Sequence, residues 1–149
     1  MTDRSNFSAL VYCIIGAAME VHRVLDSRLP EPIYQEALYL ELKDKGIESM
    51  REVEIQTYYK EHLLEKKYKM DFVVGDVVVE LKSVSKLLPD HRAQLCSYLR
   101  LTKKPIGLLI NFGEASLIGE RWAYDEITNH CFLVDKNMNP IPDSSSDSY

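Results

Sequence analysis

Residues 70–82, MDFVVGDVVVELK, constrain the fold more than any other stretch of the chain. Two apolar runs, Phe72–Val74 and Val77–Val79, flank the dipeptide Gly75-Asp76. Glycine followed by a polar residue between β-branched runs is typical of a two-residue hairpin turn, because glycine readily adopts the positive φ that such a turn requires. The stretch therefore predicts two adjacent antiparallel strands.

The predicted turn also fixes the register of this hairpin. Counting outward places Val74 opposite Val77, and three steps further it places Asp71 opposite Glu80. Because side chains alternate along a strand, one face is predicted to carry Asp71, Val73, Val78, Glu80 and Lys82, and the other Met70, Phe72, Val74, Val77, Val79 and Leu81. The two carboxylates are thus expected on one face.

Two opposed carboxylates repel each other, at a cost of roughly 0.2–1 kcal/mol on an exposed sheet and more when half-buried. A hard divalent cation between them would reverse that sign, because Mg²⁺ and Mn²⁺ favour carboxylate oxygens. Lys82 would point into the same site, where it could orient a water or hold a phosphate. The alternative is a surface hairpin whose charges are only solvated.

The composition bounds the class of protein. A length of 149 residues favours one domain, and a hydrophobic content of 46% can support a core. A formal net charge of −5 argues against clamping nucleic acid by bulk charge. Phosphate contacts would have to come from a local basic cluster, for which the sequence offers Lys60–Lys69 with Arg100, Lys103 and Lys104. A solvated strand face is the alternative.

The three cysteines, Cys13, Cys96 and Cys131, are far apart and without CxxC spacing, so neither a zinc site nor a disulfide scaffold is expected. Free thiols in a reducing compartment fit best. The apolar stretch Ala9–Met19 is too short to span a bilayer and predicts a buried helix. With no targeting segment expected, the prediction is a cytoplasmic protein that makes no membrane contact.

The remaining patterns predict the elements around the hairpin. Helices are expected from about Ser8 to Leu25, from Pro30 or Pro32 to about Lys45, and from Pro89 to about Thr102. Strands are expected over 52–60, 63–74, 77–82 and 105–112, the last parallel to 77–82, with an edge strand over 117–122. Residues 124–134 fit a strand or a helix. The predicted domain spans residues 1–134, and residues 135–149 form a polar tail expected to be disordered.

This element order and its motifs resemble the PD-(D/E)XK nuclease superfamily. Asp71 followed by Glu80-Leu81-Lys82 matches the D…ExK signature, and Gln94 with Tyr98 matches the QxxxY motif of the RecB-like branch. More narrowly, the chain resembles the GxxExxY proteins in IIGAAMEVHRVL, EPIYQEALYLELKDKGI, VVVELK, QLCSYLR and GLLINFG. The resemblance covers roughly residues 10–121. It implies an α/β fold with a restriction-endonuclease-like αβββαβ core and a mixed sheet flanked by helices.

The resemblance also implies roles for individual side chains. It assigns metal binding to Glu20, Asp71 and Glu80, and catalysis to Asp71, Glu80, Lys82, Gln94 and Tyr98. Lys82 would assist the attacking water and stabilise charge on the phosphate, while Gln94 and Tyr98 would orient the site or the substrate. The alternatives are a packed helix face for Gln94 and Tyr98, and a solvated helix end for Glu20.

The chain departs from the GxxExxY motif at one position. Arg28 stands where the motif has glycine, whereas Glu31 and Tyr34 are kept. The geometry of the loop before Glu31, and any role for Glu31, therefore stay open.

The implied activity is a Mg²⁺- or Mn²⁺-dependent nuclease that hydrolyses phosphodiester bonds by a metal-activated water, with DNA the first expected substrate and RNA the second. The alternative is a catalytically silent nuclease-fold module that binds nucleic acid or protein within a larger complex, which the acidic balance favours. A purely structural, dimerising domain is a weaker third interpretation. Beyond nucleic acid, the expected partners are a second copy or a larger nucleic-acid-processing complex.

Overall fold

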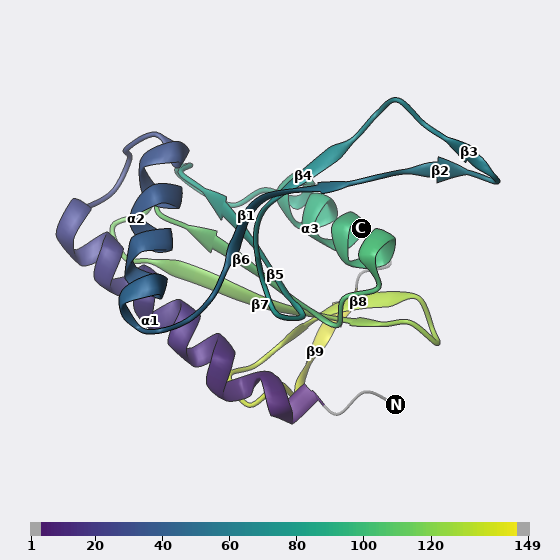
Figure 1. Cartoon of the computed structure of the whole chain (residues 1–149). Helices are drawn as coiled ribbons and strands as arrows, with labels where there is room; N and C mark the ends of the chain where they lie inside the picture. The colour runs from purple at the N-terminus through teal and green to yellow at the C-terminus, as the bar shows by residue number, and fades with distance from the viewer. Residues whose placement is uncertain (1–3, 146–149) are drawn as a thin grey trace.

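The computed structural model describes residues 4–145, and the side chains of residues 143–145 fall outside that description. A seven-stranded sheet forms the centre, in the order β1-β4-β5-β6-β7-β8-β9. Helices α1 (Ser8–Leu25) and α2 (Glu31–Asp44) cover one face, and α3 (Pro89–Thr102) covers the other (Figure 1). The β5–β6 pair is parallel and the other neighbours are antiparallel. The predicted fold class, a mixed sheet flanked by helices, is confirmed.

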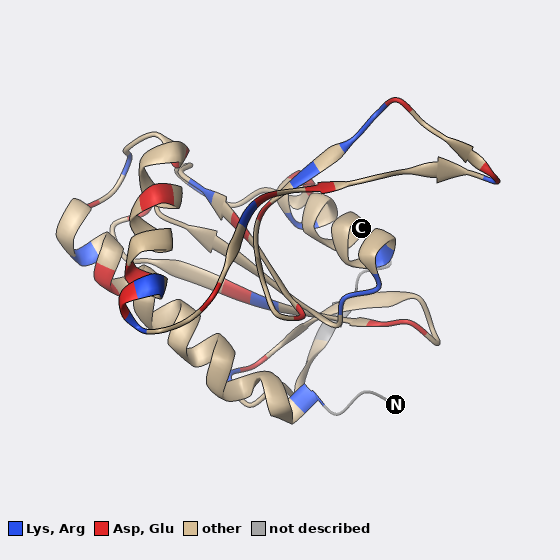
Figure 2. Cartoon of the chain, viewed as in Figure 1, with Lys and Arg blue, Asp and Glu red and all other residues tan. Residues whose placement is uncertain are grey.

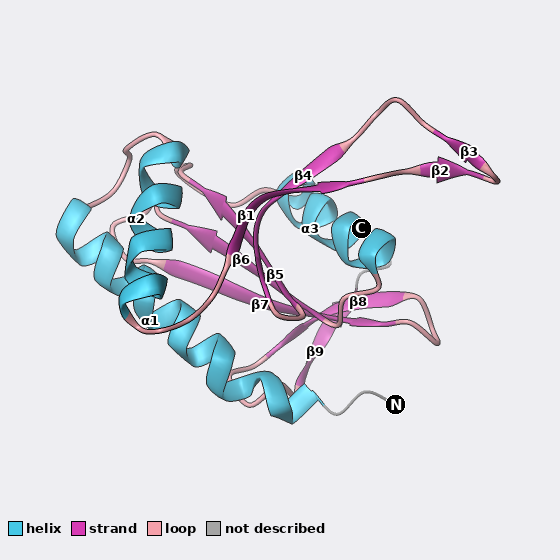
Figure 3. Cartoon of the chain, in the orientation of Figure 1, coloured by secondary structure: helices cyan, strands magenta, loops and turns pink. Residues whose placement is uncertain are grey.

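The strands and the remaining helical turn complete the element order (Figure 3). Their bounds are η1 Arg4–Phe7, β1 Met50–Ile55, β2 Tyr58–Tyr59, β3 His62–Leu63, β4 Tyr68–Val74, β5 Val77–Lys82, β6 Ile106–Asn111, β7 Ile118–Asp125, β8 His130–Val134 and β9 Pro140–Ser145. The predicted parallel pairing of the strand after α3 with the hairpin is confirmed, since Val77 pairs with Ile106 and Lys82 with Asn111.

Two apolar cores lie on the two faces of the sheet. Val77 and Val79 of β5 pack with α1 and α2, whereas Val78 between them packs with Leu95 and Leu99 of α3. A strand buried on both faces needs apolar residues at every position, which explains the uninterrupted runs in β5 and β6. The sheet is therefore fixed between helices on both sides near the hairpin.

The central hairpin forms with the predicted turn. Gly75 has a φ of 59°, and the ladder pairs Val74 with Val77, Val73 with Val78 and Phe72 with Val79. The register read from the turn is thus confirmed over these three pairs.

One residue of the hairpin departs from the predicted alternation. Met70 packs on the α3 face with Val73 and Val78, although it was expected on the face of Phe72. Because Met70 and Phe72 lie two apart and face opposite cores, the strict period of two is interrupted at Asp71, where side-chain hydrogen bonds replace regular pairing.

The predicted strands 52–60 and 63–74 are each divided. β1 ends at Ile55, and β2 pairs with β3 in a separate two-stranded sheet within the segment 56–67, here called the arm. The arm extends away from the body of the molecule (Figure 1). At its base the Thr57 hydroxyl donates to the carbonyl oxygen of Lys66 over 2.6 Å, which ties its two sides together.

The C-terminal part of the sheet corrects two expectations and decides one alternative that the sequence left open. β7 is an interior strand between β6 and β8, not an edge strand, and residues 130–134 form a strand. Residues 140–145, placed in the predicted disordered tail, form β9 against β8. Met138 between the two strands is 3% exposed, so burial of this apolar side chain anchors the turn that joins them. The polar composition of the segment gave no sign of this turn. Residues 146–149 of the predicted tail lie outside the described residues.

The expectation of free thiols is wrong for two cysteines. Cys96 on α3 and Cys131 on β8 are joined by a disulfide, whereas Cys13 is free and exposed. A sequence separation of 35 residues gave no spacing signal, and only the packing of α3 on the sheet brings the two together.

In the described part of the chain, one helical segment, Arg4–Leu25, is long and apolar enough to cross a membrane. The core helix of a soluble protein passes the same test, and α1 buries Val11, Ile14, Ala17, Ala18 and Val21 against the sheet. The predicted buried helix is therefore buried on one face, whereas Tyr12, Met19 and Val24 are exposed.

Candidate active site

Five of the six predicted site residues line one pocket. This pocket has a volume of about 290 Å³ and lies where α2, α3 and the open ends of β4 and β5 meet. Its lining includes the predicted residues Asp71, Glu80, Lys82, Gln94 and Tyr98, together with Glu31, Gln35, Glu52 and Lys69. Here it is called the acidic pocket.

Asp71 and Glu80 meet where the β4–β5 ladder ends. The Asp71 backbone N–H donates to Glu80 Oε1 over 2.9 Å, and the Leu81 N–H donates to Asp71 Oδ2 over 2.8 Å. Each carboxylate thus binds the backbone of the opposite strand. These reciprocal bonds hold the two acids together at the mouth of the hairpin, on the adjacent strands that the register predicted.

The neighbouring strand opens at the same level. The β1–β4 register passes from Arg51 opposite Phe72 to Val53 opposite Met70, with Glu52 at the interruption. Glu52 has a φ of 53°, a left-handed conformation that costs a non-glycine residue roughly 1–3 kcal/mol. Its carboxylate accepts a hydrogen bond from Gln35 Nε2 over 3.2 Å. This irregularity brings a further acid to the acidic pocket.

Burial makes the acid pair electrostatically unfavourable in its fully ionised form. Glu80 is 4% exposed, and burial, followed by the nearby Asp71 charge, raises its pKa well above the usual range. Burial also raises the pKa of Asp71, although the Leu81 hydrogen bond opposes the shift. Either a proton or a bound cation would relieve this repulsion.

Lys82 brings a positive charge to the acidic pocket and is held there by Gln94. Lys82 Nζ donates to Gln94 Oε1 over 3.1 Å, which joins β5 to α3. Burial and the charges of Glu80 and Asp71 raise the pKa of Tyr98 to about 12. Tyr98 therefore keeps its proton at neutral pH and can donate a hydrogen bond.

Packing places α3 where Gln94 and Tyr98 reach the acidic pocket. Leu95 and Leu99 pack directly over Gly107 of β6, where an added Cβ would approach the Leu95 side chain to 2.9 Å. The Arg92 guanidinium also makes a bidentate ion pair with Glu120 of β7, with a shortest distance of 2.8 Å. The helix that carries the QxxxY residues is thereby fixed on the sheet.

The structure does not bring Glu20 to the acidic pocket. Its carboxylate instead pairs with Arg23 one turn along α1, at 2.6 Å, and this hydrogen bond lowers the Glu20 pKa. The i,i+3 spacing of the two residues made this local pair available. Among residues 4–145, no group of three or more His, Cys, Asp or Glu side chains is arranged to hold a metal ion.

The loop before α2 explains the altered motif position. Arg28 adopts a φ of 69°, the left-handed region that glycine enters without steric cost. The Tyr34 hydroxyl donates to the Asp26 carbonyl oxygen over 2.6 Å and accepts from the Leu29 N–H. The loop therefore keeps a glycine-type conformation despite Arg28, and it places Glu31 at the acidic pocket. The sequence pointed to Glu31 because this residue keeps its motif position, whereas no pattern in the sequence pointed to Glu52 as a pocket residue.

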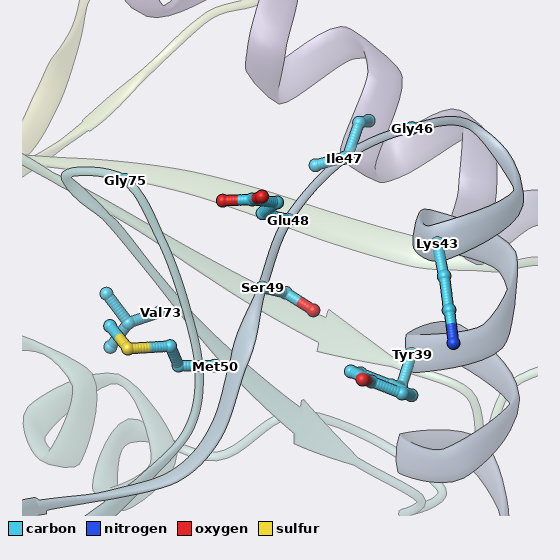
Figure 4. Close-up of a pocket in the computed structure, with 9 residues that line it drawn as sticks. All are labelled: Tyr39, Lys43, Gly46, Ile47, Glu48, Ser49, Met50, Val73 and Gly75. Carbon is cyan, nitrogen blue, oxygen red and sulfur yellow. The ribbon is translucent and has the colours of Figure 1, made fainter.

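A larger pocket of about 610 Å³ lies elsewhere, between the end of α2 and the segment leading into β1 (Figure 4). Its lining includes Tyr39, Lys43, Glu48, Ser49 and Val73. These residues include a single acid, and the pocket shares no lining residue with the acidic pocket. The predicted chemistry therefore belongs to the smaller pocket.

The comparisons with known proteins identify the superfamily of this chain. The family model of the PD-(D/E)XK nuclease superfamily matches residues 8–122, and the chain belongs to this superfamily. No curated protein matches the sequence significantly. Among solved structures, the chain is similar to SSO0001, with 19% sequence identity and a TM-score of 0.48, over 84% of this chain and 65% of that one.

Proposed function

We propose that this chain is a divalent-metal-dependent nuclease of the RecB-like branch, within the GxxExxY group, that hydrolyses phosphodiester bonds in DNA. The observation that carries the proposal is the pair Asp71 and Glu80, held on adjacent strands beside Lys82. This arrangement places two carboxylates and the Lys82 ammonium group within one partly buried pocket.

The acidic pocket suits a hard cation. Glu80 is almost fully buried next to Asp71, and burial raises the pKa of both carboxyl groups, although the nearby Lys82 charge opposes the shift. Carboxylate oxygens are the ligands that Mg²⁺ and Mn²⁺ prefer. When bound, such an ion supplies charge neutralisation at the phosphate and a more acidic water.

The other side chains have complementary tasks. Lys82, held by Gln94, would place its ammonium beside a phosphate oxygen and stabilise the charge that develops there. Tyr98, protonated at neutral pH, would donate a hydrogen bond to the substrate. Glu31 and Glu52 replace Glu20 as the additional acids available at the acidic pocket.

A catalytically silent binding module is the second candidate. Two observations favour it: the described residues hold no ready three-acid cluster, and the chain carries a net charge of −5. The cytoplasmic setting, and assembly with a second copy or a larger nucleic-acid-processing complex, stay predictions.

The test is cleavage of labelled DNA and RNA with Mn²⁺, Mg²⁺ or EDTA. We expect metal-dependent cleavage that Glu80→Gln reduces by about 10²-fold or more, since removal of one charge-stabilising group has effects of that size. Glu20→Gln is the matched control, because it makes the same chemical change on α1 outside the acidic pocket. Equal activity of the two variants would reject the site, and no cleavage by the wild type would favour the binding module.

A further inference from the structure

A cleft between the arm and α3 adjoins the acidic pocket. It has a volume of about 690 Å³, and Tyr58, Lys66 and Tyr68 line one side while Gln94, Tyr98 and Arg100 line the other. Here it is called the arm cleft. Gln94 and Tyr98 also line the acidic pocket, so the two hollows share a wall.

Two exposed tyrosines line the arm cleft. Tyr58 is 59% exposed and Tyr68 is 38% exposed. The Tyr68 ring centroid lies 5.9 Å from that of Tyr98, so the aromatic surface continues from the start of β4, at the base of the arm, to α3. Exposed aromatic faces beside a catalytic pocket are surfaces on which planar groups can stack.

Positive charge accompanies these rings. Lys66 Nζ lies 5.7 Å from the centroid of the Tyr68 ring, and Arg100 lines the opposite side of the cleft. The lining holds one acidic residue, Asp90. Residues 56–69 carry four lysines and two glutamates, in a chain that is acidic overall. In Figure 2 the segment between β3 and β4 is blue where its lysines lie and red where its glutamate lies. Local charge therefore complements a phosphate backbone here.

We infer that the arm cleft binds an unpaired strand of nucleic acid and leads it into the acidic pocket. Stacking needs an open base face, and in a duplex both faces of an interior base are covered by its neighbours. Lys66 and Arg100 would contact phosphates, which carry no sequence information, so binding would tolerate any sequence. The inference rests on the proposed nuclease function and specifies its substrate as single-stranded.

Other predicted basic residues lie outside the arm cleft. Lys104 lies 3.7 Å from Asp76 in the hairpin turn, Lys103 contacts Tyr124, and Lys67 pairs with Glu54. The predicted basic cluster is thus divided, and only Lys66 and Arg100 of its members line the arm cleft.

Binding measured in EDTA tests the inference without requiring cleavage. Fluorescence anisotropy would compare short labelled single strands of DNA and of RNA with a blunt duplex of the same sequence. We expect tighter binding of a single strand, and a loss of about tenfold in Tyr58→Leu, as expected for one stacked base. Comparison of the DNA strand with the RNA strand decides which of the two is preferred.

The chain provides two matched controls. Tyr59 is 60% exposed and adjacent to Tyr58 on the same strand but does not line the arm cleft, so Tyr59→Leu should bind like the wild type. In the same way, Lys66→Gln should weaken binding and reduce its salt dependence more than Lys67→Gln. Matching thermal melts would establish that all four variants fold.

The outcomes separate this inference from the proposed function. Equal or tighter binding of the duplex would overturn the inference that the arm cleft binds a single strand, even if Mn²⁺-dependent cleavage is observed. Equal losses of affinity in Tyr58→Leu and Tyr59→Leu would overturn it as well. Selective strand binding without any cleavage would support the arm cleft and reject hydrolysis.

Discussion

The two ends of the β4–β5 hairpin are built on opposite principles. At the turn, Gly75 takes a positive φ and the valines pair in a regular ladder. At the open end, two side-chain carboxylates accept the backbone hydrogen bonds that regular pairing would otherwise use. The difference teaches that the paired end supplies stability, whereas the open end holds buried charge that regular pairing would avoid.

The largest expected effect concerns the paired end. Phe72 is fully buried opposite Val79, so Phe72→Ala should lower the free energy of unfolding by about 3–5 kcal/mol. Lys69→Ala, three residues toward the open end and exposed, should change it by less than about 0.5 kcal/mol. Urea unfolding measures both, and comparable losses would contradict the division between the ends.

The second effect is the pH dependence of the open end. In the folded protein, burial raises the pKa of Glu80 above its ordinary value of 4.5, so without metal the folded state binds more protons than the unfolded chain. The stabilisation that comes from the proton on Glu80 is therefore fully present below the pKa of Glu80 in the unfolded chain. It is lost as the pH rises through the pKa of Glu80 in the folded protein. One such proton contributes a slope of at most about 1.4 kcal/mol per pH unit.

That slope is measured from the unfolding free energies of the wild type and Glu80→Gln in EDTA. The measurements run from below pH 4.5, the ordinary pKa, to above the raised pKa of the folded protein. The variant should show a shallower loss of stability as pH rises, while Glu20→Gln should follow the wild type. A wild-type protein that gains stability relative to Glu80→Gln as pH rises would show that the sign is wrong.

The third effect is the response of the open end to metal. Asp71→Asn removes one charge at nearly constant shape, so without metal the variant should be at least as stable as the wild type. With free Mn²⁺ at about ten times its dissociation constant, the wild type should gain roughly 1.4 kcal/mol and the variant much less. Thermal melts with EDTA and Mn²⁺ measure this, and equal shifts in both proteins would mean that Asp71 is not a ligand.

Much of the site was predictable because its signals are local. The glycine turn set the register that brings Asp71 near Glu80, and helical spacing placed Gln94 and Tyr98 one turn apart on α3. Glu20 was misplaced because the family resemblance assigned it to the metal, whereas its i,i+3 spacing to Arg23 allows a local ion pair on α1.

The sequence by itself determined the hairpin and the helices, since turn chemistry and periodicity act over a few neighbouring positions. The family resemblance added the mixed sheet and five residues of the acidic pocket, Asp71, Glu80, Lys82, Gln94 and Tyr98. Only the tertiary structure decided the opening of the ladder at Asp71, the Cys96–Cys131 disulfide, the added strand β9 and the arm cleft. These features depend on contacts between segments distant in the chain. At the opened ladder, for example, the backbone N–H groups of Asp71 and Leu81 find side-chain acceptors because burial removes water from them.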